Sequence, residues 1–108
     1  MNTDNDTKKY LPLTEATYYI MLALVEPLHG YGVMQKVTLL SAGMVELGPG
    51  TLYGVLTTLE KEKLIVMLRE EERRKIYSLT PNGRSVLRTQ IGRLEVMTRN
   101  GQQILSQL

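Results

Sequence analysis

Cysteine, tryptophan and phenylalanine are absent from this 108-residue chain, and histidine occurs once. Without cysteine the sequence offers no disulfide, no thiolate metal ligand and no cysteine nucleophile. A single histidine argues against a histidine-rich metal cluster or a catalytic triad, and we find no nucleophile motif or phosphate-cradling loop. We therefore expect no catalytic residues, no metal and no cofactor, and a protein that is not an enzyme.

Long hydrophobic runs are missing as well. No segment approaches the ~20 apolar residues that a membrane-spanning helix needs, and residues 1–9 are polar. The expected location is the cytoplasm, without membrane contact. The 43% of hydrophobic residues suffice for one small core. We expect a flexible N-terminal arm over residues 1–10, a folded unit over residues 11–80 and a C-terminal helix over residues 81–108.

Positive charge is concentrated toward the C-terminus. Residues 69–108 contain eight Lys or Arg and four Glu, whereas residues 1–68 contain five Lys and seven Asp or Glu. Every arginine lies in the C-terminal part. This asymmetry hints at an anionic partner such as nucleic acid, although on charge alone an ordinary solvated surface is the favoured interpretation.

Helix signals mark three segments in the first part of the chain. Thr14 suits the N-cap of a first helix, which Pro27 ends. A second helix is expected over about residues 30–41. The third begins at Pro49, with Gly48 as its N-cap, and its leucines recur at helical spacing.

The hydrophobic period then changes from helical to alternating. Residues 64–68 form an apolar run and residues 75–79 alternate, which predicts two strands joined by a charged hairpin loop over residues 69–74. Thr80 and Pro81 mark the start of a long amphipathic helix. At 1.5 Å per residue this helix would reach ~40 Å, too long for the small body to cover, which favours a homodimer over a helix folded back on its own domain. The expected dimerisation face consists of Leu87, Ile91, Leu94, Met97, Ile104, Leu105 and Leu108.

The order of these elements is that of a winged helix-turn-helix. The expected fold class is therefore mainly α with a small β-hairpin, followed by a long C-terminal dimerisation helix. The third helix can enter a DNA major groove, and the hairpin forms the wing. Small, hydroxyl-bearing and cationic side chains on that helix can approach base edges, and wing cations can contact phosphate. The predicted DNA-contacting residues are Thr51, Tyr53, Gly54, Thr57, Thr58, Lys61, Arg73, Arg74 and Lys75.

Each of these signals has a plainer interpretation. The helix face could be ordinary exposed surface, and Glu70, Glu71 and Glu72 could neutralise the wing cations. A winged-helix module that binds protein instead of DNA is therefore the alternative function. His29 could act as a pH switch, but a structural or incidental role in a loop is favoured.

Three blocks of the chain, in register, resemble the PadR family of bacterial transcriptional regulators. They are LHGYGV at residues 28–33, PGTLYGVLTTLEKEKLI at residues 49–65 and RRKIYSLTPNGRSVL at residues 73–87. The resemblance is to compact members with a single C-terminal helix. It implies a homodimeric winged-helix protein that binds a palindromic operator in double-stranded DNA, usually as a repressor released by a small molecule.

Two positions depart from the family pattern. Gly54 stands where the family often has Pro after GTLY, which implies a more flexible recognition helix here. Lys63 stands where the family usually has Gly before the first wing strand, so the geometry of that turn is open.

The resemblance also implies a place for an effector. Some members bind flat aromatic molecules between the C-terminal helices, often against a Trp, and this chain has no Trp. A candidate pocket for a small aromatic effector is therefore restricted to walls formed by Tyr18, Tyr19, Met21 and Met97. Plain core packing is the favoured interpretation of these four side chains.

Overall fold

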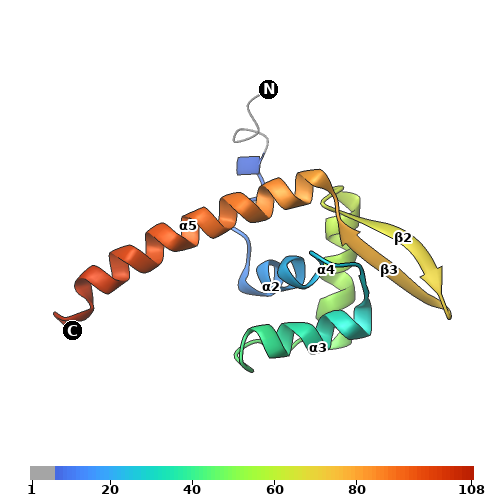
Figure 1. Ribbon diagram of the computed structural model, residues 1–108, viewed down its shortest axis with the longest axis horizontal. Helices are drawn as coiled ribbons and strands as arrows, with labels where there is room; N and C mark the ends of the chain where they lie inside the picture. The colour runs from blue at the N-terminus through green and yellow to red at the C-terminus, as the bar shows by residue number, and fades with distance from the viewer. Residues whose placement is uncertain (1–6) are drawn as a thin grey trace.

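Figure 1 shows the computed structural model of the chain, which describes residues 7–108. The elements in order are α2 (Glu15–Ala23), β1 (Leu28–His29), α3 (Gly30–Leu40), α4 (Pro49–Lys61), β2 (Ile65–Glu71), β3 (Arg74–Leu79) and α5 (Pro81–Leu105). This mainly α architecture with a small antiparallel sheet confirms the predicted winged helix-turn-helix. Over these residues, no helix is both long and apolar enough to cross a membrane.

The predicted helix starts are confirmed. Thr14 caps α2, because its side-chain oxygen accepts a hydrogen bond from the Thr17 amide at 3.1 Å. Thr80 caps α5 in the same way, through the Gly83 amide at 3.0 Å. Pro49 lies in the first turn of α4, where its missing N–H costs nothing. Local capping chemistry therefore fixes where these helices begin.

The hairpin turn is tighter than predicted. The prediction of a charged six-residue loop over residues 69–74 is therefore wrong. β2 and β3 stay paired as far as Glu71 and Arg74, which leaves only Glu72 and Arg73 in the turn. Both have positive φ, at 50° and 67°. Such φ values are typical of a type I′ turn, which is usually made by Asn-Gly. Because neither residue type is present here, the sequence gives no signal for the tight turn.

A third strand, β1, was not predicted. Its two residues, Leu28 and His29, pair with Tyr77 and Ile76 of β3, so β3 is the middle strand in the order β1-β3-β2. The expected alternation of buried and exposed residues in β3 is therefore wrong. Residues 76–79 are all buried, because β3 is the middle strand and α3 and α5 both contact it.

The hydrophobic core lies between the helices and the inner part of the sheet. α4 contributes Leu52, Leu56 and Leu59, whose 3–4 spacing turns one helix face inward. The opposite face of α4 is thereby held toward solvent. The side chains that fill the centre are Ile20, Met21, Leu24, Val33, Val37, Leu52, Leu56, Leu64, Ile65 and Val86.

The two ends of the described chain differ. The predicted arm covers residues 1–10, of which residues 1–6 lie outside the described part. Thr7 is buried and Tyr10 packs against the core, so residues 7–10 belong to the folded body and differ from a free arm. At the other end, α5 packs with Val86 and Leu87 and then projects well beyond the body (Figure 1).

Candidate nucleic-acid interface

The solvent face of α4 carries all the residues that the sequence assigned to it. Each of these side chains is exposed, and so are the three wing cations; together they are Thr51, Tyr53, Gly54, Thr57, Thr58, Lys61, Arg73, Arg74 and Lys75. The leucine stripe on the buried face of α4 produces this arrangement. Exposure makes these residues available to a ligand, and the grooves around α4 determine which of them can act together.

Two threonines on α4 have their hydroxyl protons occupied by the helix itself. Thr57 Oγ1 donates to the Tyr53 carbonyl at 2.8 Å, and Thr58 Oγ1 donates to the Gly54 carbonyl at 3.1 Å. Each hydroxyl oxygen therefore keeps only acceptor capacity toward an outside partner, beside a methyl group. Such a surface suits the amino groups of adenine or cytosine and the methyl group of thymine.

Tyr53 rests on the start of α3. A Cβ placed on Gly30 would lie 2.7 Å from Tyr53 Oη and 2.9 Å from Tyr53 Cε1, so only glycine leaves room for the ring. The tyrosine stays 51% exposed. Gly30 is thus a positioning residue that the sequence reasoning missed, although the HGYG block contains it.

A groove of about 400 Å³ separates α4 from the wing, and it gathers five of the predicted residues. Tyr53 and Thr57 form one wall, and Arg73, Arg74 and Lys75 form the other. The groove brings the exposed face of α4 and a cationic strand to one place. We call it the helix–wing groove; it is also lined by His29, Gly30, Tyr31, Glu70 and Tyr77.

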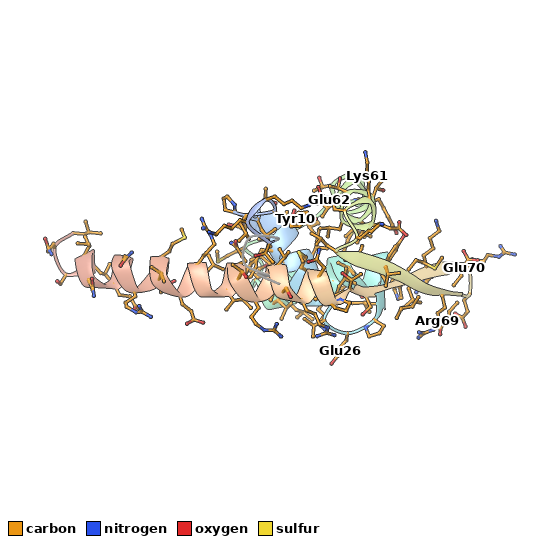
Figure 2. The ribbon with its side chains drawn as sticks, turned by 90° about the horizontal axis from the view of Figure 1, so that it is seen from above. Tyr10, Glu26, Lys61, Glu62, Arg69 and Glu70 are labelled. Atoms are coloured by element: carbon orange, nitrogen blue, oxygen red, sulfur yellow. The ribbon has the colours of Figure 1, made fainter. Side chains whose placement is uncertain are left out.

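The remaining predicted residues of α4 lie elsewhere. Thr51, Gly54 and Thr58 line a second groove, of about 450 Å³, on the side of α4 that faces Tyr10. Lys61 lies at the end of α4, and Figure 2 shows it well away from Glu70 near the wing tip. The exposed face of α4 therefore extends beyond the helix–wing groove on both sides.

The wing acids neutralise fewer cations than the sequence allows. Arg69 Nε is paired with Glu71 Oε1, and both side chains are about half exposed. Among residues 7–108, Arg73, Arg74 and Lys75 form no ion pair, and Glu70 is the only acid among the residues lining the helix–wing groove. The groove therefore carries an excess of positive charge.

His29 is not a loop residue, which corrects the sequence interpretation. It belongs to β1 and caps α3, since its Nδ1 accepts a hydrogen bond from the Gly32 amide at 3.1 Å. Its other ring nitrogen, Nε2, lies 3.2 Å from Arg74 Nη1. The structural role favoured from the sequence is real, and the ring also borders the helix–wing groove.

Tyr77 closes the floor of this groove from β3. Burial raises the pKa of its phenol above the ordinary value, and the charges of Glu60 and Tyr53 raise that pKa further. The phenol therefore keeps its proton at physiological pH. It offers a neutral O–H and adds no negative charge beneath the cations.

The left-handed turn at the wing tip gives the first prediction. Replacing Glu72 and Arg73 together with Asn and Gly should stabilise the protein by about 1 kcal/mol, because Asn-Gly adopts this turn without strain. Urea unfolding at a fixed protein concentration measures the change. Glu72→Ala with Arg73→Ala is the matched control, since it removes the same two charges and should not stabilise. Equal stability of the wild type and the Asn-Gly variant would show that the turn stores no strain.

The candidate effector residues are only partly brought together. Tyr18, Tyr19 and Met97 line a groove of about 320 Å³ between α2 and α5. Met21 is fully buried in the core and does not line it, because the helical repeat of α2 points it inward. The two tyrosine rings meet edge to face, 5.4 Å apart. Burial, and then neighbouring Tyr19, raise the pKa of the Tyr18 phenol above its ordinary value, so this wall is uncharged.

The predicted dimerisation face divides into an inner and an outer part. Leu87 is buried against the body, while Ile91 and Leu94 are half-buried. The outer residues are exposed: Met97, Ile104, Leu105 and Leu108. The apolar stripe therefore continues past the point where this chain can cover it.

Known proteins match both the sequence and the fold. The transcriptional regulator PadR-like family matches residues 20–89, which is most of the chain. A curated relative, an uncharacterized 37.1 kDa protein in transposon TN4556 of Streptomyces fradiae, is 39% identical over 74 residues. That match covers 68% of this chain but only 21% of the relative, so the chain spans about a fifth of the relative's length.

Solved structures share the fold at lower identity. A transcriptional regulator from Clostridium thermocellum superposes with a TM-score of 0.68 at 21% identity, over 92% of this chain and 96% of that one. A PadR family regulator from Eggerthella lenta has a TM-score of 0.69 at 23% identity, over 94% and 86%. BpsR of Bordetella bronchiseptica, whose DNA binding is regulated by 6-hydroxynicotinic acid, has a TM-score of 0.67 at 20% identity, over 91% and 70%. With the family match over residues 20–89, the winged-helix architecture and no catalytic constellation in the described residues, the chain belongs to the PadR-like family of transcriptional regulators.

Proposed function

We propose that this protein is a homodimeric repressor that binds a palindromic DNA operator. In this proposal α4 reads the major groove and the wing contacts the backbone. The observation that carries it is the helix–wing groove, where an exposed hydroxyl-bearing helix face meets three cations that form no ion pair within residues 7–108 and outnumber the single acid, Glu70. The proposed DNA contacts are Thr51, Tyr53, Gly54, Thr57, Thr58, Lys61, Arg73, Arg74 and Lys75.

In this proposal two parts of the chain have separate roles. Residues 11–80 bind DNA, and residues 81–108 form the dimerisation helix. The apolar stripe of α5 supports this division, because its outer half is exposed in a single chain and a second copy would cover it. Two recognition helices in such a dimer would contact half-sites about one DNA turn apart.

Release by a small aromatic effector is the second element of the proposal. The α2–α5 groove supports it, since Tyr18 and Tyr19 supply flat, uncharged surface next to the proposed dimer helix. A ligand there would alter how the two helices pack. Titration with 6-hydroxynicotinic acid, the compound that regulates BpsR, should perturb the Tyr18 ring resonances and weaken DNA binding. No change in either signal would remove this groove from the proposal.

The contact residues can be tested with a duplex enriched from a randomised library by the wild-type protein. Tyr53→Ala should weaken binding by about tenfold or more while the protein stays folded, because a base- or phosphate-contacting group is lost. Thr51→Ala should act in the same direction. Gly30→Ala should weaken binding as well, since its Cβ displaces the Tyr53 ring. Unchanged affinity in all three would contradict the assignment of α4.

The wing is tested separately through salt. Arg73→Ala with Arg74→Ala should lower the slope of log affinity against log salt by about 0.9 for each lost phosphate contact. Arg88→Ala with Arg99→Ala is the matched control, because these arginines are exposed on α5 outside the helix–wing groove. If both pairs change the slope equally, the wing has no special role. Enrichment of no duplex, together with a protein partner held at high salt, would favour the alternative function.

A further inference from the structure

His29 has more hydrogen-bond donors around it than it can satisfy. The Gly32 amide points at Nδ1 from 3.1 Å, and Arg74 Nη1 lies 3.2 Å from Nε2. A neutral imidazole has one lone pair and one N–H, and a guanidinium only donates. Because Nδ1 accepts from Gly32, the ring hydrogen is on Nε2, where it faces the Arg74 donor.

Two donors that face each other define a position for an acceptor. The Nε2–H and the Arg74 guanidinium can both be satisfied by one anionic oxygen placed between them and slightly outward. Among the described residues no carboxylate is hydrogen-bonded or ion-paired to His29 or Arg74: Glu71 is paired with Arg69, and Glu72 lines a hollow beside His29 and Arg74 without bonding to either. The two donors can therefore take an anion from outside the chain.

The surroundings of this pair indicate the kind of anion. His29 and Arg74 line the helix–wing groove together with Arg73, Lys75 and Glu70, and they also line a second hollow with Glu71 and Glu72. Tyr53 and Thr57 of the base-reading helix lie in the same groove. A DNA strand that leaves the reach of α4 toward the wing would carry its phosphates past this point.

We infer that His29 and Arg74 form a seat for one phosphate of the DNA backbone. The Nε2–H of His29 and the Arg74 guanidinium donate to the same non-bridging oxygen, and the cap on α3 fixes the ring tautomer that makes this possible. The inference rests on the proposed DNA-binding function and adds to it a contact residue from β1. His29 thus links the start of α3, the sheet and the wing to one phosphate.

His29→Asn is the discriminating substitution. Asparagine is among the best N-cap residues, so the cap on α3 is kept while the donor toward Arg74 is lost. Affinity for the library-enriched duplex should fall about 100-fold, since a hydrogen bond to a charged group, worth about tenfold in affinity, is lost in each of the two protomers. Circular dichroism and the unfolding midpoint should stay at wild-type values.

A double-mutant cycle identifies the partner. Once Arg74→Gln has removed the cation, adding His29→Asn should cost little more, because the two groups serve one oxygen. With Arg73→Gln, a cation of the same groove that does not contact His29, the two losses should multiply. If the losses multiply in both cycles, His29 and Arg74 do not donate to the same phosphate oxygen and the inference is overturned.

Duplexes with one neutral methylphosphonate in each half-site, at symmetry-related positions, locate the phosphate. At one such position the wild type and His29→Asn should bind equally well, and at the others the difference of about 100-fold should persist. If His29→Asn binds every duplex like the wild type while Tyr53→Ala does not, the inference is wrong and the proposed function stands. If the wild type enriches no duplex and only inorganic phosphate shifts the His29 ring resonances, the seat holds a free anion and the assignment to DNA falls.

Discussion

Gly83→Ala should destabilise this protein by about 3 kcal/mol or more, a severe effect for the addition of one methyl group. A Cβ at this position would lie 2.0 Å from the carbonyl oxygen of Leu64 and 3.0 Å from its carbonyl carbon. Both are backbone atoms at the entry of β2, so no side-chain rotation relieves the overlap. The start of α5 would have to move off the sheet.

That junction has little freedom to move. The Leu64 carbonyl accepts the Thr80 amide at 3.0 Å, and Thr80 Oγ1 both accepts the Gly83 amide and donates to the Lys63 carbonyl at 2.7 Å. Shifting α5 would break these bonds as a group and open the packing around Val86. Relief of the overlap therefore costs hydrogen bonds and buried apolar surface.

Gly92→Ala provides the matched control on the same helix. No atom outside the immediate chain lies within 4 Å of a Cβ built there, so the change should stabilise α5 by roughly 0.5–1 kcal/mol. Urea unfolding of both variants at one protein concentration measures the change in the free energy of unfolding, which should be negative for Gly83→Ala and positive for Gly92→Ala. Destabilisation of similar size at Gly92 would show that α5 tolerates no alanine, and would contradict a specific contact with Leu64.

Local signals explain why so much of the fold could be predicted. Each confirmed helix start depends on a capping residue next to its own helix, as Thr14 and Thr80 illustrate. The leucine stripe of α4 then orients that helix without any knowledge of its neighbours. With these elements in order, the winged helix-turn-helix follows from topology.

The features that the sequence did not predict, β1 and the tight wing turn, have a non-local cause. β1 is only two residues long and exists because Leu28 and His29 find partners in β3, far along the chain. The tight wing turn requires Glu72 and Arg73 to adopt positive φ, which strand pairing imposes against their preference. Sequence patterns carry no record of either effect.

In the candidate site, too, local features were predictable and non-local contacts were not. Exposure of the α4 face was predictable, since burying one face of a helix exposes the other. The close contact between the Tyr53 ring and Gly30 was not predictable, because it depends on how closely α3 and α4 approach each other. Lys63, where the family usually has glycine, takes φ of 61°, so the turn before β2 keeps a left-handed geometry despite the departure. Met21 is buried in the core, as the favoured interpretation had it, since a residue near a pocket in sequence can point away from it.

Ile104→Glu should convert the protein to monomers. Along α5, Leu94, Met97, Gly101, Ile104 and Leu108 recur at spacings of three and four, which is the seam of a helix pair. In a symmetric dimer each substitution acts twice. Loss of about 2 kcal/mol of apolar burial in each protomer would raise the dimer dissociation constant by about 1000-fold, before the charge of the glutamate is considered.

Val96→Glu is the control that makes this result specific. Val96 and Ile104 are both 49% exposed in the single chain, and both lie on the outer part of α5. Eight residues at 100° each put Val96 about 80° around the helix from Ile104 and about 120° from the centre of the seam, so Val96 lies on the flank and only Ile104 belongs to the seam. Sedimentation velocity at a fixed protomer concentration should show monomers for Ile104→Glu and dimers for Val96→Glu. The reverse outcome would shift the interface to the flank that carries Val96.

DNA binding should follow the oligomeric state in these two variants. A monomer contacts one half-site, whereas in a dimer the first contact holds the second recognition helix at a high effective concentration near its own half-site. Affinity for the enriched duplex should therefore fall by about 100-fold or more for Ile104→Glu and stay near wild type for Val96→Glu. Because the C-terminal end of α5 projects away from the wing (Figure 1), such a loss would reach DNA only through the second protomer.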